Sequence, residues 1–383
     1  MKPQLLKKKA RAVVYLPAAC EHDGYTGPLY GYYVDNTNQY NVLSTVPDEA
    51  DRRSYIIGSI CDEKPVPLPA GRLRGWRDAE GKLHFADADG KRCDIERYSL
   101  KLDVFSRNTG ILESDIMLRA GVVLVGCGSV GSLIAVELAK AGVGRFMLID
   151  NDILGYHNVC RHQCGVHDVG RYKTDAVADR IHDINPEAEV VKCNAIIQEV
   201  SLEALARFCT PDTIIVGGAD NREGDLYANS VAREAGVPMM SVGFWERAFA
   251  GEIFYTLPGL PDYADFMWSI GGMSGRATQN RKFYTNEADL AKTVFEPGIS
   301  IDINFVTIVA VKLILDILNR DNDRYTPRLL GHLTQYTLVC NTNNPKLGGD
   351  NAEIFSYPLQ VTTSIEVPFA PKEERHRNGQ NAE

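Results

Sequence analysis

Three glycines and one acid at fixed spacing form the first group of residues in this sequence that could do chemistry. Gly126, Gly128 and Gly131 follow the apolar run Val122–Val125 and open an apolar segment with helical periodicity. Glycines at these positions permit a tight turn, and the free amides of a helix start can hold a phosphate. Asp150 ends the next apolar run, nineteen residues after Gly131, close to the spacing at which an acid meets a ribose hydroxyl. The stretch predicts a nucleotide site; the alternative is a Gly-rich turn in another α/β protein.

Basic and acidic side chains follow at positions that a parallel sheet would bring to one crevice. Arg161 lies in the loop after the ribose acid, Lys173 opens a helix, and Asp220 and Asn221 follow the apolar run Thr213–Gly218. The carboxyl ends of parallel strands meet at one edge of a sheet, so these side chains should surround the nucleotide phosphates. Hydride transfer has no need of such a set. Phosphoryl or nucleotidyl transfer does, because charge builds on phosphate oxygens and must be neutralised by cations and a metal.

Each of these three charged residues also has a structural explanation. Arg161 could make a surface salt bridge, Lys173 could be a solvated lysine in a first helical turn, and Asp220 could cap the following helix. Exposed ion pairs contribute only about 0–1 kcal/mol to stability. Activity measurements on substituted proteins therefore separate the two explanations.

The elements that must position these residues alternate between strand and helix from Gly121 onward. This pattern predicts an α/β fold with a doubly wound, mostly parallel sheet. The predicted strands are Val122–Val125, Phe146–Ile149, Glu189–Cys193, Thr213–Gly218, Pro238–Val242 and Glu252–Tyr255, and the predicted helices are Leu112–Leu118, Lys173–Asp183, Leu202–Phe208 and Asp225–Ala235. Phe305–Leu318 is apolar on nearly every side, which fits either a buried helix or a subunit interface.

The chain divides into segments of different composition. Residues 1–100 alternate short apolar runs with turns rich in Asp, Asn, Gly and Pro, which predicts a small β-rich or α+β domain for partner docking or a structural lid. Residues 101–345 form the nucleotide domain, in which the Gly-, Asn- and Ser-rich segment 258–298 is expected to be an irregular crossing loop. Residues 346–370 are expected to supply closing strands, and the polar tail 371–383 to be disordered.

Composition excludes several classes of partner. The 383 residues carry a net charge of −9, from 41 basic and 50 acidic side chains, so nucleic-acid binding has no electrostatic support. No apolar run reaches membrane-spanning length, and no membrane partner is expected. The nine cysteines form no CxxC pair, and an odd number without a framework predicts reduced thiols and a cytoplasmic location.

At the residues quoted above the chain resembles the ThiF/MoeB/ubiquitin-activating enzyme superfamily, over roughly residues 101–320. Members adenylate the C-terminal carboxylate of a ubiquitin-like or sulfur-carrier protein with Mg·ATP, on a Rossmann-like adenylation domain, and usually work as homodimers. Phe105–Asn108 is similar to an upstream element whose arginine, here Arg107, enters the partner subunit's active site. The resemblance implies a phosphate turn at Gly126, Gly128, Ser129 and Gly131, a ribose contact at Asp150, nucleotide-site positions at Asp152, Asn158 and Asn221, phosphate contacts at Arg161 and Lys173, and Mg²⁺ at Asp220.

The same resemblance leaves the later steps and the partners open. His162 after Arg161 is typical of bacterial stand-alone or operon-borne members, which are often paired with a conjugating enzyme and a peptidase. Residues 210–339 contain no cysteine, so the reaction either stops at the acyl-adenylate or continues on a cysteine elsewhere, such as Cys160 or Cys164. The other interpretations are an inactive scaffold that binds a ubiquitin-like protein, a peptide-adenylating enzyme, and an NAD-dependent oxidoreductase.

Overall fold

Two compact units make up the chain. The computed structural model describes residues 9–18, 24–45, 55–61, 72–99, 103–218, 222–270, 297–355 and 361–365. The first unit is Met1–Thr109 with Asn185–Glu187, and the second is Gly110–Ile184 with Ala188–Glu383. No helix in the described ranges combines the length and the apolarity needed to cross a membrane.

The N-terminal unit is built on a seven-stranded sheet with the order β6-β5-β4-β2-β3-β1-β7. Its strands are β1 (Val13–Pro17), β2 (Gly27–Val34), β3 (Gln39–Ser44), β4 (Tyr55–Cys61), β5 (Leu73–Arg77), β6 (Leu83–Ala86) and β7 (Asp94–Tyr98). Side chains such as Val14, Leu16 and Leu29 are fully buried in one cluster against this sheet. The prediction of a β-rich unit is therefore confirmed.

The second unit contains an eight-stranded sheet with the order β10-β9-β8-β11-β12-β13-β14-β15. The strands from β10 through β12 are parallel, and β13, β14 and β15 are added antiparallel. Their bounds are β8 (Gly121–Val125), β9 (Arg145–Ile149), β10 (Glu189–Cys193), β11 (Thr213–Gly217), β12 (Met239–Phe244), β13 (Ala250–Thr256), β14 (Tyr336–Cys340) and β15 (Val361–Ile365). This is the predicted α/β architecture.

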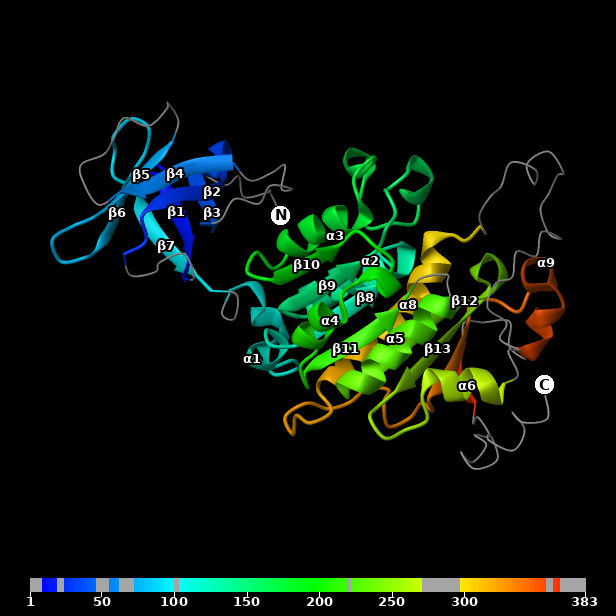
Figure 1. The fold of residues 1–383 in the computed structure, drawn as a ribbon. Helices are drawn as coiled ribbons and strands as arrows, with labels where there is room; N and C mark the ends of the chain where they lie inside the picture. The colour runs from blue at the N-terminus through cyan, green and yellow to red at the C-terminus, as the bar shows by residue number, and fades with distance from the viewer. Residues whose placement is uncertain are drawn as a thin grey trace. The chain divides into compact units, whose positions relative to one another are not determined.

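Helices cover both faces of this sheet (Figure 1). The helices are α1 (Ser114–Met117), α2 (Ser129–Lys140), α3 (Lys173–His182), α4 (Leu202–Phe208), α5 (Arg222–Ala235), α6 (Tyr263–Ser269), α8 (Ser300–Leu318) and α9 (Pro345–Gly348). Along β8, Val122 and Leu124 join the cluster that contains α2, α3 and α8, whereas Val123 and Val125 join the cluster with α4, α5 and α6. Period-two alternation explains why a central strand must be apolar on both sides.

The apolar helix α8 lies in the core. It packs on α2 and β13, and its residues Val306, Ala310 and Ile314 have no exposed surface. The sequence left open a buried helix or a subunit interface for Phe305–Leu318. The structure places most of that segment inside the second unit, and the homodimer stays a prediction.

Two segment predictions need correction. Residues 258–298 are not irregular throughout, because α6 forms over Tyr263–Ser269, where Asp262 and Asp265 cap each other's backbone amides and Phe266 is buried. The remainder from 271 to 296 lies outside the described residues. Residues 346–370 supply a closing strand as predicted, β15 on the edge of the sheet, but among the described residues α9 and a 3₁₀ segment precede it. A proline at the start of α9, with the Asn344 side chain accepting from the Lys346 amide, favours a helical turn there.

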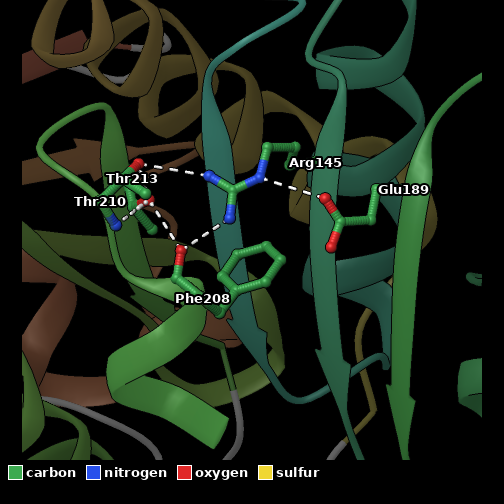
Figure 2. A network of polar contacts seen from close by, with 5 residues as sticks. All are labelled: Arg145, Glu189, Phe208, Thr210 and Thr213. Atoms are coloured by element: carbon green, nitrogen blue, oxygen red, sulfur yellow. Dashed lines mark hydrogen bonds and ion pairs between the residues drawn. The ribbon is translucent and has the colours of Figure 1, made fainter.

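A polar cluster fastens the amino ends of three parallel strands (Figure 2). Arg145, the first residue of β9, donates to Glu189 Oε2 at 3.3 Å, to Thr210 Oγ1 at 3.2 Å and to the Phe208 carbonyl at 2.8 Å. Its guanidinium lies over the Phe208 ring, 4.6 Å from the centroid. Thr213 at the start of β11 accepts from the Thr210 amide. One side chain thus ties β9, β10 and the turn before β11.

Arg145→Met should lower the free energy of unfolding by roughly 1.5–3 kcal/mol, because hydrogen bonds to a charged donor are lost while their acceptors stay partly buried. Urea denaturation measures the change. Arg207→Met is the matched control, since Arg207 pairs with Glu203 on the surface, with side chains 80% and 82% exposed. Equal destabilisation in the two variants would contradict the role given to the Arg145 cluster.

Candidate functional site

A cavity of about 570 Å³ opens at the carboxyl edge of the parallel strands. Each of the five parallel strands contributes the residues that follow its last position. Gly126 follows β8, Asp150 follows β9, 195–198 follow β10, Gly218 follows β11 and Trp245 follows β12. The sheet topology therefore gathers loops that are distant in sequence around one space.

The glycine turn needs its glycines for different reasons. Gly126 has φ +99°, a left-handed conformation that favours glycine. Gly131 is buried under the turn, and a Cβ there would lie 1.9 Å from the Gly126 carbonyl oxygen. Gly128 lines the cavity, and a Cβ there would meet nothing within 4 Å. Gly126 and Gly131 thus serve the turn itself, and Gly128 keeps open the space in front of α2.

Asp150 is tied to the same turn through its carboxylate. Oδ2 accepts from the Cys127 amide at 2.7 Å, and Oδ1 accepts from the Asp152 amide at 2.8 Å. Each carboxylate oxygen has a second lone pair that could accept from a sugar hydroxyl. The acid therefore organises the turn and also faces the cavity.

Lys173 enters the cavity with a carboxylate beside it. Its Nζ lies 2.6 Å from Asp152 Oδ2, and its backbone amide donates to the Asp152 carbonyl at 3.0 Å. Lys173 is only 8% exposed, whereas the Asp152 side chain is 65% exposed. The alternative of a solvated first-turn lysine is therefore wrong. A buried ammonium at this position can meet an anion that enters the cavity.

Arg161 and Asn158 belong to one loop on the cavity wall. Asn158 Oδ1 accepts from the Gly155 amide at 2.9 Å, and the Arg161 amide donates to the Asn158 carbonyl at 3.0 Å. Arg161 is half-buried and lines the cavity, and Asn158 and Ser129 also line it. The arrangement brings a second cation to the space in front of the glycine turn.

The roles expected of three further site residues stay predictions. Asp220 and Asn221 lie outside the described residues, so their predicted nucleotide and Mg²⁺ contacts stay predictions. Arg107 is exposed in the 3₁₀ turn Ser106–Asn108 of the N-terminal unit, and its predicted role in a partner's site also stays a prediction. Within the part of the chain that the structure describes, no group of three or more His, Cys, Asp or Glu side chains is placed to hold a metal.

The apolar wall of the cavity was not predicted from the sequence. Phe244, Trp245 and Ala248 line it beside the end of β12. The Trp245 indole donates to Glu252 Oε2 at 3.0 Å, which fixes the ring. Arg247 and Ala248 follow with φ +52° and +54°, a conformation that costs non-glycine residues energy and is found at functional sites. The rule that strand ends meet at one edge, applied also to Pro238–Val242, would have pointed to this wall.

The cysteines differ sharply in exposure. Cys127 is buried, and burial raises the pKa of its thiol. Burial, with a smaller contribution from Asp168, raises the pKa of Cys164 to about 12, which leaves it a poor nucleophile. Cys160 is exposed beside Arg161. Of the two cysteines that flank Arg161, only Cys160 has the access that thioester chemistry needs.

Comparison with known proteins identifies the family to which this chain belongs. The sequence matches the ThiF family over residues 102–340, more than half of the chain, and the chain belongs to this family. It is 25% identical over 223 residues to ubiquitin-like modifier-activating enzyme 5 of Drosophila erecta, covering 56% of this chain and 55% of that protein. It is 38% identical over 106 residues to tRNA threonylcarbamoyladenosine dehydratase of Bacillus subtilis (strain 168), covering 27% and 42%.

The solved structures that resemble this one include that of E. coli MccB with ATP. The TM-score is 0.49 at 19% identity, over 70% of this chain and 74% of that one. The chain spans about half the length of the curated relatives that it matches.

Proposed function

We propose that this chain activates the C-terminal carboxylate of a ubiquitin-like protein by joining it to AMP, with Mg·ATP as the second substrate. The observation that carries the proposal is the placement of the glycine turn, Asp150, Arg161 and Lys173 around one cavity. Membership of the ThiF family and the likeness to ubiquitin-like modifier-activating enzymes support it.

The chemistry follows from the charges at the cavity. A C-terminal carboxylate is ionised at neutral pH, so no general base is needed before it attacks the α-phosphorus and expels pyrophosphate. Both reactants are anionic and repel each other. Lys173 and Arg161 reduce that repulsion, and Lys173 does so with little reorganisation because Asp152 holds it before substrate arrives. The amides that open α2 and the open space at Gly128 are suited to phosphate oxygens.

A magnesium ion would neutralise charge on the phosphates of ATP, and Asp220 is our candidate for holding it. We propose that Asn221 contacts the nucleotide and that the chain forms a homodimer in which Arg107 enters the site of the second subunit. We also propose that a conjugating enzyme takes part in the step after adenylation. We also propose a cytoplasmic location, which is supported by the eight described cysteines that are all free thiols.

The test is ATP–pyrophosphate exchange, followed by intact mass spectrometry. Wild-type protein incubated with Mg·ATP and ubiquitin-like proteins should catalyse exchange only with partners whose C-terminal tail is intact, and should leave an AMP mass on the partner. The same partner without its last residues is the matched control. Exchange driven by short peptides alone would favour a peptide-adenylating enzyme. Nicotinamide reduction without Mg²⁺, or the absence of exchange with every carboxylate, would contradict the proposal.

A further inference from the structure

His162 is a buried histidine that joins the arginine-bearing loop to the glycine turn. It is 8% exposed. Its Nε2 lies 2.7 Å from the Cys127 carbonyl oxygen, and its Nδ1 lies 3.1 Å from the Cys164 amide nitrogen. The ring therefore spans two segments 35 residues apart in the chain.

The partners of the two ring nitrogens fix the protonation state. A backbone amide can only donate, so Nδ1 must accept from Cys164. A carbonyl can only accept, so Nε2 must carry the proton that His162 donates to Cys127. Both hydrogen bonds exist together only in the neutral Nε2–H tautomer, because a protonated ring has no acceptor for the Cys164 amide.

The contact with Cys127 places this bridge next to the candidate site, since Gly126, Gly128 and Arg161 line the cavity. The amide of Cys127 donates to Asp150 at 2.7 Å, while its carbonyl accepts from His162. The same loop is also held to α2, because the Gln163 amide donates to Ser132 Oγ at 3.3 Å. Arg161 directly precedes His162 and therefore shares this attachment to the glycine turn.

We propose that His162 is a positioning residue, which in its neutral form fixes Arg161 in front of the glycine turn. The inference rests on the proposed function only in taking Arg161 as a phosphate contact. It goes beyond that function because it names a residue that acts through Arg161 and gives the state in which it acts.

The surroundings favour the neutral ring. Burial lowers the pKa of His162, and Lys173 acts in the same direction, while the bond to Cys127 and the charges of Asp150 and Asp168 oppose it. Because the folded protein binds this proton more weakly than the unfolded chain, the contribution to stability is complete above the ordinary histidine pKa, about 6.5, and is lost as pH falls toward the folded value. The bridge should therefore weaken only in acid.

Three substitutions test the proposal by ATP–pyrophosphate exchange. His162→Ala, which removes both hydrogen bonds, should lower kcat/KM by about tenfold. His162→Gln should recover part of that loss, because its amide can still donate to Cys127 although it has no ring nitrogen for Cys164. Wild-type activity should fall in acid as His162 becomes protonated, and this fall should be absent in His162→Gln, which does not titrate. His182→Gln is the control, since His182 also contacts a carbonyl, that of Ala188 at 3.1 Å, away from the cavity.

A double-mutant cycle distinguishes positioning from general stability. In an Arg161→Ala background, His162→Ala should cause little further loss, because the residue through which it acts is gone. Fully additive losses would overturn the inference. A substrate-free measurement is independent of the proposed function: ¹⁵N NMR should show the Nε2–H tautomer, and hydrogen exchange at the amides of residues 161–164 should accelerate in His162→Ala. An Nδ1–H tautomer or unchanged exchange would overturn it, whereas a wild type with these signatures and no ATP turnover would contradict only the proposed function.

Discussion

Lys173→Met is expected to lower the rate of ATP–pyrophosphate exchange by about 10²–10³-fold while leaving the melting temperature almost unchanged. The methionine keeps the packing of the buried aliphatic stem but removes the ammonium that we propose contacts the phosphates. The Asp152 carboxylate that loses its partner is 65% exposed, so water can solvate it and the fold loses little.

The matched control for this change is Lys192→Met. Lys192 also pairs with a carboxylate, Asp175, at 2.9 Å, but it lies on β10 and does not line the cavity. We expect near wild-type exchange from this variant. Normal exchange in Lys173→Met, or an equal loss in both variants, would contradict a role for Lys173 in the reaction.

Gly131→Ala is expected to abolish nucleotide binding and to destabilise the fold. The new Cβ would lie 1.9 Å from the Gly126 carbonyl oxygen. Both atoms are fixed to the backbone, so neither can move aside as the end of a flexible side chain could. The glycine turn must therefore move away from α2, at a cost of about 1–3 kcal/mol or more. Nucleotide affinity from isothermal titration calorimetry, together with urea denaturation, measures both effects.

Gly128→Ala is the companion substitution, in which the two effects should separate. Because a Cβ at Gly128 meets nothing within 4 Å, the variant should fold with wild-type stability. It should still bind nucleotide more weakly, since the methyl group occupies space next to the amides of α2. Unchanged affinity in Gly128→Ala would show that phosphate does not approach this position.

Much of the second unit could be predicted from local pattern. The predicted strand Glu189–Cys193 and helix Leu202–Phe208 coincide with β10 and α4. Central strands that are buried on both faces read as continuous apolar runs, and the glycines and charged residues mark where each strand ends. The rule that the carboxyl ends of parallel strands meet at one edge therefore also predicted that Gly126, Asp150, Arg161 and Lys173 lie together, and the structure brings them to one cavity.

What could not be predicted depends on contacts between distant residues. The burial of Lys173 and its ion pair with Asp152, 21 positions earlier, arise from the tertiary fold, and no local property of a first-turn lysine predicts them. The bridge from His162 to Cys127 has the same origin. Helix α6 was missed because its capping acids stand in a segment rich in Gly and Pro, and burial of Phe266 against Phe254 stabilises it.

The position of the Arg145 cluster has a consequence for how this protein could change its substrate. The residues that fasten β9, β10 and β11 lie at the amino ends of those strands, and the cavity lies at their carboxyl ends. The Arg145 cluster therefore joins these strands at the end opposite the cavity, with contacts that a change in the loops around the cavity leaves in place. Replacing the exposed residues Ile153, Tyr156 and His157 with those of another family member, while the buried Leu154 is kept, should alter which carboxylate is accepted, and the hybrid should unfold at nearly the same urea concentration as the parent.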